Sequence, residues 1–154
     1  MLRLQKSFVL VDLDADDSDF VIRSLADRLH QAGAVSVDYG AATIAREHQH
    51  ATGLPTQPFP IAFPHADAEG VFESALAVAT LKSPVGFQNM ADPDEELPVE
   101  IVIMLANKSP EEQIQTLRNL AELFGEPDKL SELRVMDKQE EIVDWLKKEL
   151  DIEG

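Results

Sequence analysis

Val99-Glu100-Ile101-Val102-Ile103-Met104-Leu105 decides the fold, because apolar residues stand at consecutive positions in it. Side chains of a strand point alternately to the two faces of a sheet, so a strand with one face in water alternates apolar and polar residues. Residues 101–105 instead place apolar side chains on both faces. This pattern predicts an interior strand of a sheet that helices cover on both sides.

The segments before and after this run supply further strands and helices. Strands are predicted for three short apolar segments, at residues 7–13, 59–63 and 75–81. Helices are predicted from the N-cap residues 16–18 to Gly33, from Tyr39 to about His48, and from Asp137 onward. Together these elements predict one α/β domain over residues 1–154, a sandwich in which helices flank a mixed β-sheet.

Ser109-Pro110-Glu111-Glu112 predicts the start of another helix. Serine suits the N-cap, proline suits the first helical position, and a glutamate three residues after the serine completes a capping box. An apolar stripe that begins at Ile114 continues the helix. Gly125, followed by Pro127, is expected to end it.

Charge and composition limit the kinds of function. The 154 residues carry a net charge of −16 at pH 7, and such a polyanion repels DNA and RNA, so no nucleic-acid binding is predicted. No segment approaches the roughly 20 apolar residues that span a bilayer. The chain has no cysteine, which excludes disulfides and thiolate chemistry. We therefore expect a cytoplasmic protein that meets a membrane only through its partners.

His65 is the candidate functional residue among the four histidines. It follows Pro64 at the end of an apolar segment, where proline restricts the backbone and the chain must leave the sheet. Open α/β folds bind ligands at such a rim, and a neutral imidazole is a competent nucleophile. A histidine after a proline is by itself a weak pattern, so a structural role stays open at this point.

The other three histidines fit structural or solvated roles. His30 falls in the last turn of a predicted helix, where an imidazole is compatible with the helix dipole. His48 and His50 could suggest a metal pair, but side chains two apart on a helix face different ways. We therefore predict no metal site. The chain also lacks Walker, Gly-x-Gly-x-x-Gly and Gly-x-Ser-x-Gly motifs, so no cofactor is predicted and any phosphate would arrive on a partner.

Arg46 is the candidate phosphate-binding residue. It lies in Ile44-Ala45-Arg46-Glu47, on a predicted helix that ends shortly before Thr52-Gly53. A guanidinium group facing His65 would bind phosphate oxygens in a fork. From the local sequence alone, a surface arginine paired with an acid such as Glu47 is the alternative interpretation.

These residues resemble the mannitol/fructose class of enzyme IIA domains of the bacterial sugar phosphotransferase system. The match lies in Ala45-Arg46-Glu47, in Thr52-Gly53-Leu54 and in Ile61-Ala62-Phe63-Pro64-His65, and it extends over essentially the whole chain. Two departures favour the galactitol-like branch. The segment before Ile61 is longer than in mannitol-type members, and Gln113-Ile114 stands where many relatives have a His-Leu pair.

The resemblance implies a phosphotransferase component of sugar transport. Such a protein is a histidine phosphocarrier in a chain of kinase-like phosphoryl transfers. HPr would donate the phosphoryl group, and a IIB component would accept it, most plausibly one of galactitol type. His65 would be the phospho-acceptor through Nε2, and Arg46 would steady the phosphate. Gln113 and Thr52 are expected to support the phosphate, helped by the amino end of the helix that begins at Ser109.

A second function remains open on the sequence. A regulatory, nitrogen-type enzyme IIA would be phosphorylated on the same histidine but would signal by binding other proteins. The sequence is expected to act as a lone domain by docking, since no fused segment precedes Ser7 or follows Leu150. The sugar, the oligomeric state and the residue that fixes the tautomer of His65 are not predictable from the sequence.

Overall fold

A computed structural model of the protein describes residues 2–152. The chain forms helices and strands in the following order: 3-10 helix η1 (Lys6–Phe8), β1 (Val9–Leu13), α1 (Ser18–Gln31), α2 (Tyr39–Gln49), β2 (Gly53–Leu54), β3 (Ile61–Ala62), 3-10 helix η2 (Ala68–Gly70), β4 (Ala75–Gln88), β5 (Glu96–Ala106), 3-10 helix η3 (Pro110–Gln113), α3 (Ile114–Phe124), α4 (Pro127–Val135) and α5 (Gln139–Glu149). Within residues 2–152, no helix is long and apolar enough to cross a bilayer.

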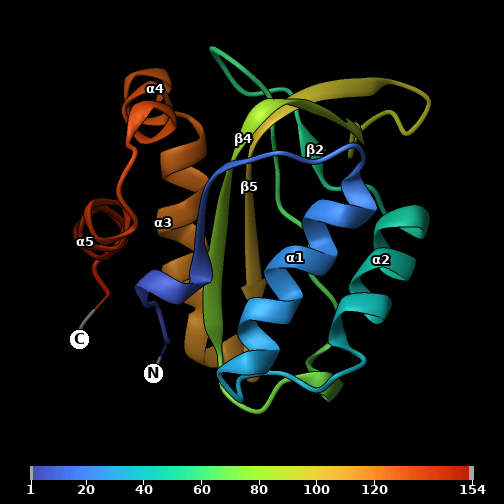
Figure 1. Ribbon diagram of the computed structural model, residues 1–154, viewed down its shortest axis with the longest axis vertical. Coiled ribbons are helices and arrows are strands. Elements are labelled where there is room, and N and C mark those ends of the chain that lie inside the picture. Colours follow the sequence, from blue (N-terminus) through green and yellow to red (C-terminus); the bar gives the residue numbers. More distant parts are fainter. Residues whose placement is uncertain (1, 153–154) are drawn as a thin grey trace.

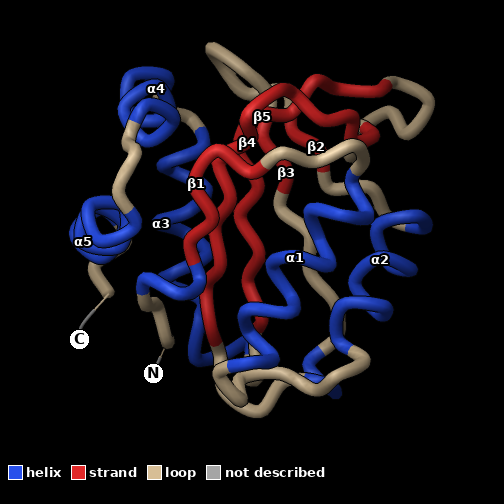
Figure 2. The backbone as a smooth tube through the Cα atoms, viewed as in Figure 1, coloured by secondary structure: helices blue, strands red, loops and turns tan. Residues whose placement is uncertain are grey.

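The strands form one mixed sheet in the order β1-β4-β5-β3-β2. The predicted interior strand, β5, lies in the middle of this order, antiparallel to β4 and parallel to β3. β1 runs parallel to β4, and the short β2 and β3 pair antiparallel. The prediction of an interior strand in a mixed sheet is therefore confirmed, and Figure 2 shows the strands between two groups of helices.

Each face of the sheet carries its own apolar core. Along β5, Val102 and Met104 belong to the core that also contains α1 residues such as Leu25. Ile103 and Leu105 point the other way, into the core formed with α3, α4 and α5. Figure 1 shows α1 and α2 on one side of the sheet and α3, α4 and α5 on the other. The two-faced apolar pattern thus leads to the predicted α/β sandwich.

The first helix has the predicted start and end signals. Asp17 is the N-cap of α1, and its Oδ1 accepts a hydrogen bond of 2.9 Å from the backbone N–H of Phe20. After the helix, Gly33 adopts a φ of 76°, and its N–H bonds to the carbonyl of His30. Glycine adopts this left-handed conformation without strain, so it ends the helix and turns the chain back toward the core.

After β5, one prediction was wrong and one helix was missed. The capping box at Ser109 does not form: the Ser109 hydroxyl donates to Glu111 over 3.3 Å, and the first turn is the 3-10 helix η3. Gly125 and Pro127 do end α3, but Pro127 also starts α4, which the sequence analysis missed. Proline lacks an N–H group that the first turn does not need, so it begins a helix as readily as it ends one.

β4 is longer than predicted. The apolar segment 75–81 continues to Gln88, and the pairing with β5 shifts register between Thr80 and Val85. Such a bulge lets exposed residues interrupt the apolar pattern without ending the strand. Residues 82–84 are exposed, which explains why the sequence pattern stops at Leu81.

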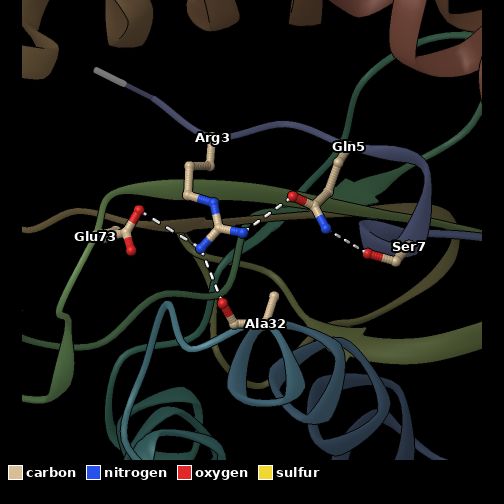
Figure 3. A network of polar contacts seen from close by, with 5 residues as sticks. All are labelled: Arg3, Gln5, Ser7, Ala32 and Glu73. Carbon is tan, nitrogen blue, oxygen red and sulfur yellow. Dashed lines mark hydrogen bonds and ion pairs between the residues drawn. The ribbon is translucent and has the colours of Figure 1, made fainter.

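The N-terminal segment is tied to the rest of the fold through Arg3 (Figure 3). Its Nη1 donates to the carbonyl oxygen of Ala32 over 2.9 Å and lies 3.5 Å from a carboxylate oxygen of Glu73. Its Nη2 donates to Gln5, whose amide in turn donates to Ser7. One guanidinium group therefore links this segment to the end of α1 and to the loop before β4.

We expect Leu133→Ala in α4 to lower the free energy of unfolding by about 2–5 kcal/mol, because Leu133 is fully buried and a cavity would remain. Val135→Ala is the matched control in the same helix. Val135 is 79% exposed, so its truncation should change stability by no more than about 0.5 kcal/mol. Urea denaturation measures both. Equal, small effects would show that α4 does not pack on the sheet.

Candidate functional site

The candidate site lies where two parallel strands end. β3 and β5 run in the same direction, so the residues that follow them emerge at the same edge of the sheet. Phe63-Pro64-His65 follows β3, and Asn107 follows β5. His65 lines a cleft of about 450 Å³ whose walls are mostly apolar, with lining residues that include Phe63, Asp67, Met90, Leu105, Asn107, Pro110 and Leu117.

His65 is held by the backbone just before it. Its Nδ1 lies 3.0 Å from the carbonyl oxygen of Phe63. A carbonyl oxygen can only accept a hydrogen bond, so Nδ1 is the donor and carries the ring hydrogen. Nε2 then keeps its lone pair, and a lone pair is what a nucleophilic nitrogen needs. The partner that fixes the tautomer is thus a backbone atom, for which the sequence offers no residue-type signal.

Aromatic contacts hold the imidazole ring from the side. The ring centroids of Phe63 and His65 are 5.9 Å apart. Phe63 in turn makes an edge-to-face contact with Phe124 at the end of α3, at a centroid distance of 5.7 Å. Such pairs favour defined ring orientations. α3 therefore helps to place the histidine, although it is distant from His65 in the sequence.

Tyr39 supports the chain on the other side of His65. It stands at the start of α2 with a fully buried ring, and its hydroxyl accepts a hydrogen bond of 3.4 Å from the N–H of Ala66. Burial raises the pKa of Tyr39, against the hydrogen bonds from Ala66 and Thr43. The phenol is therefore neutral, and it anchors the backbone immediately after the histidine.

Arg46 lies beside the segment that follows His65. It projects from the last turn of α2, and its Nη1 is 3.2 Å from Oδ1 of Asp67, two residues beyond the histidine. Its Nε is buried without a hydrogen-bond partner among the described residues. Arg46 lines a second hollow of about 630 Å³ and not the cleft of His65, but Ala66 and Asp67 line both. The guanidinium is therefore close to the site, and it is paired with Asp67, an acid as the alternative interpretation expected, although not with Glu47.

Glu47 and Thr52 form a buried clamp at the end of α2. Glu47 is 8% exposed, and its two carboxylate oxygens accept hydrogen bonds from the N–H and the hydroxyl of Thr52, at 2.8 and 2.7 Å. Burial raises the pKa of Glu47, while the Thr52 bonds and the nearby His65 and His48 oppose this rise. Thr52 has its only hydroxyl hydrogen committed to Glu47, so any support it gives to a phosphate is indirect.

Asn107 and Gln113 are two polar residues of the segment that follows β5. Gln113 is buried at the end of η3, at 3% exposure, and within residues 2–152 no hydrogen bond joins it to His65. Asn107 lines the cleft, and its Oδ1 is buried without a partner in the described part of the chain. The sequence analysis did not single out Asn107, because its position becomes meaningful only when β3 and β5 are paired.

Two of the remaining histidines, His30 and His48, have hydrogen-bond partners. Nδ1 of His30 lies 3.1 Å from the carbonyl oxygen of Val35. Nε2 of His48 lies 2.9 Å from Oδ1 of Asp19, so it links α2 to α1. These contacts agree with the structural or solvated roles predicted for both residues.

Comparison with known proteins identifies the family. Residues 3–149 match the family described as phosphoenolpyruvate-dependent sugar phosphotransferase system, EIIA 2. The galactitol-specific EIIA component of this system in Escherichia coli (strain K12) is 31% identical over 121 residues, which are 79% of this chain and 80% of that protein. The transcriptional regulator ManR of Bacillus subtilis (strain 168) is 36% identical over 124 residues, and the chain spans only 17% of its length.

A solved structure has the same fold. The complex of mannitol enzyme IIA and phosphorylated mannitol enzyme IIB from Escherichia coli contains a chain that aligns with a TM-score of 0.75 at 21% identity, covering 98% of this chain and 99% of that one. The protein described here therefore belongs to the EIIA 2 family of the phosphoenolpyruvate-dependent sugar phosphotransferase system. It is a phosphotransfer component of that system, with the mixed sheet and flanking helices of mannitol/fructose-type enzyme IIA.

We expect Glu47→Gln to remove a pH-dependent cost of folding. Because burial raises the pKa of this carboxyl above its ordinary value of 4.5, the folded state binds its proton more tightly than the unfolded state. The contribution of Glu47 to the free energy of unfolding therefore falls as pH rises above 4.5 and levels off above the folded-state pKa. Chemical denaturation between about pH 5 and pH 8 should show a steeper decline in the parent protein than in the variant. Parallel curves would contradict the expectation.

Proposed function

We propose that this protein carries a phosphoryl group on Nε2 of His65, accepts it from phosphorylated HPr and passes it to a IIB component. The observation that supports this most directly is the hydrogen bond from Nδ1 of His65 to the Phe63 carbonyl. It leaves Nε2 as the unprotonated nitrogen beside a cleft. No nucleotide motif is present, so a phosphorylated protein partner is the source of the group.

The transfer needs positioning more than acid–base chemistry. The lone pair of Nε2 attacks phosphorus in line, the nitrogen–phosphorus bond of phospho-HPr breaks, and its electron pair returns to the imidazole of HPr. Throughout the transfer, the hydrogen stays on Nδ1 of His65, which donates it to the Phe63 carbonyl. Transfer to IIB reverses this order, with the acceptor side chain of IIB attacking the same phosphorus. Holding the ring in place lowers the barrier by removing the cost of orienting it.

Arg46 supplies the positive charge for the phosphoryl group. Its guanidinium lies beside the segment after His65 and contacts Asp67, an acid whose side chain is 87% exposed. An exposed ion pair of this kind is weak, so a phosphoryl group on His65 can compete with Asp67 for the same donors. A guanidinium–phosphate fork is stronger than a single neutral hydrogen bond.

A galactitol-type IIB is the proposed recipient. The similarity to the galactitol-specific EIIA component covers four fifths of both chains. The longer segment before Ile61 and the Gln113-Ile114 pair are the two places where the sequence departs from the mannitol pattern. Gln113 is buried beside the start of α3 and is proposed to stabilise the phosphate by turning its amide toward His65. The net charge of −16 favours fast encounters with basic partner surfaces.

Phosphoenolpyruvate, enzyme I and HPr should add one acid-labile phosphate to the protein. His65→Ala should abolish it, because the nucleophile is gone. The matched controls are His48→Gln and His50→Gln, which replace exposed imidazoles outside the cleft and should be labelled like the parent protein. Peptide mapping locates the phosphate. Label that persists in His65→Ala would contradict the assignment.

The phosphorylated protein should then donate to a purified galactitol-type IIB faster than to mannitol- or fructose-type IIB. Transfer is followed as loss of label from His65 and gain of label on each IIB. Labelling of His65 without transfer to any of the three would favour a regulatory enzyme IIA, and stable binding of either form to another protein would then identify its target.

Arg46→Gln should fold normally and transfer phosphate roughly 10- to 100-fold more slowly, because it loses a charged hydrogen bond to phosphate of about 1.5–3 kcal/mol. Arg23→Gln makes the same change of charge at an exposed position on α1 and should leave the rate unchanged. Rapid-quench measurement with phospho-HPr gives both rates. An unchanged rate in Arg46→Gln would mean that the guanidinium does not meet the phosphate.

A further inference from the structure

A continuous set of hydrogen bonds leads from the buried end of α2 to the imidazole of His65. Glu47 accepts from the hydroxyl of Thr52. The same hydroxyl oxygen lies 3.3 Å from the backbone N–H of Phe63 and accepts from it. The carbonyl of Phe63 then accepts from Nδ1 of His65. Each member of this relay is fully or partly buried.

The Thr52 hydroxyl has one hydrogen, and this fixes which group in the relay donates and which accepts. A threonine hydroxyl has one hydrogen and two lone pairs. Glu47 takes the hydrogen over 2.7 Å, so the lone pairs of Thr52 are left for the N–H of Phe63. The N–H of Phe63 also lies 3.3 Å from the carbonyl oxygen of Thr52. Thr52 therefore holds the backbone of Phe63 at two points, and Glu47 sets which way the hydroxyl faces.

Pro64 transmits this constraint to the carbonyl of Phe63. A residue before proline is confined to extended conformations, and proline fixes its own φ. Once the N–H of Phe63 is held by Thr52, little freedom remains for its carbonyl direction. β2 and β3 continue the same clamp, since Gly53 pairs with Ala62. Thr52 and Gly53, which precede His65 by more than ten positions, therefore fix the Phe63 carbonyl that accepts from Nδ1.

Burying the carboxylate of Glu47 costs free energy, because a charged group loses its hydration. Glu47 is 8% exposed, and both of its oxygens bind Thr52. An apolar residue would pack there without the cost of desolvating a charge. The carboxylate is an acceptor only, so it forces the Thr52 hydroxyl to donate to it. A group that could also donate would leave the hydroxyl free to reverse.

We propose that Glu47 is a positioning residue that, through Thr52 and the backbone of Phe63, holds His65 in the tautomer with Nδ1 protonated and Nε2 free. The inference rests on the proposed function for its purpose, because a free Nε2 matters only if that nitrogen receives the phosphoryl group. The hydrogen-bond relay and the tautomer are properties of the unphosphorylated protein and are measured without any phosphate donor.

The tautomer of His65 is read directly from nitrogen-15 NMR. Histidine-labelled protein is recorded in long-range proton–nitrogen correlation spectra at about pH 9, where imidazoles are neutral. Thr52→Val removes the hydroxyl at nearly constant shape, Glu47→Gln replaces the acceptor-only group by an amide that can donate, and Thr52→Ser keeps the hydroxyl. Thr80→Val is the matched control, because it removes a buried hydroxyl on β4 that accepts from the N–H of Asp12 and belongs to no part of the relay.

The parent protein, Thr52→Ser and Thr80→Val should show His65 protonated at Nδ1. In Thr52→Val and Glu47→Gln, the ratio of the Nδ1–H to the Nε2–H tautomer should fall about fivefold, as the loss of one ordinary hydrogen bond predicts. The initial rate of phosphorylation by phospho-HPr should fall with the Nδ1–H fraction. The amide spectra show whether each variant is folded. If Glu47→Gln is unfolded, the tautomer ratio in Thr52→Val tests the relay.

Three results would overturn the inference: an Nε2–H tautomer in the parent protein, an unchanged ratio in folded Thr52→Val, or an equal change in Thr80→Val. A different result bears on the function alone. If the tautomer shifts as described but phospho-HPr labels no histidine of the parent protein, the relay stands and the phosphocarrier proposal fails.

Discussion

The burial of β5 on both faces is the constraint on which the rest of the structure depends. A strand with apolar side chains on both sides cannot face water on either side, so helices must cover both faces. α1 and α2 cover one face, and α3, α4 and α5 cover the other. Because both cores are built on β5, the sheet holds the helices on its two faces in a fixed relation to each other.

The same strand determines where chemistry can occur. β3 is parallel to β5, so both strands release their following residues at one edge. His65 and Asn107 meet there in one cleft. Helix α2 on one face brings Arg46 and Glu47 toward this edge, while α3 on the other face supplies Phe124 as a support for Phe63. The site therefore draws on both cores, although its reactive residue belongs to a short segment between them.

The sequence predicts features that depend on residue type and periodicity. It does not predict contacts made by backbone atoms, and it is ambiguous where one residue type can either end or begin a helix. The run at residues 101–105 predicted the interior strand, and Pro64 marked where the chain leaves the sheet at His65. Pro127 can mark either the end of one helix or the start of the next, and the sequence analysis used it only as an end. The tautomer partner of His65 is a carbonyl group, which every residue has. Asp67 is one of 29 acidic residues, and nothing in its local sequence marks it as the partner of Arg46.

The loop at residues 55–60 can vary in length, because the pairing of β2 with β3 fixes both of its ends. Gly53 pairs with Ala62, Leu54 pairs with Ile61, and Thr52 binds Phe63, while the loop itself extends beyond the sheet in Figure 1. Closing a longer loop costs little extra entropy, and the hydrogen bonds that orient the imidazole all lie below it. Natural insertions, epitope tags or fluorescent labels placed at this tip would therefore leave the nucleophile undisturbed. The segment is a site where relatives can diverge in length and acquire new surface without rebuilding the chemistry.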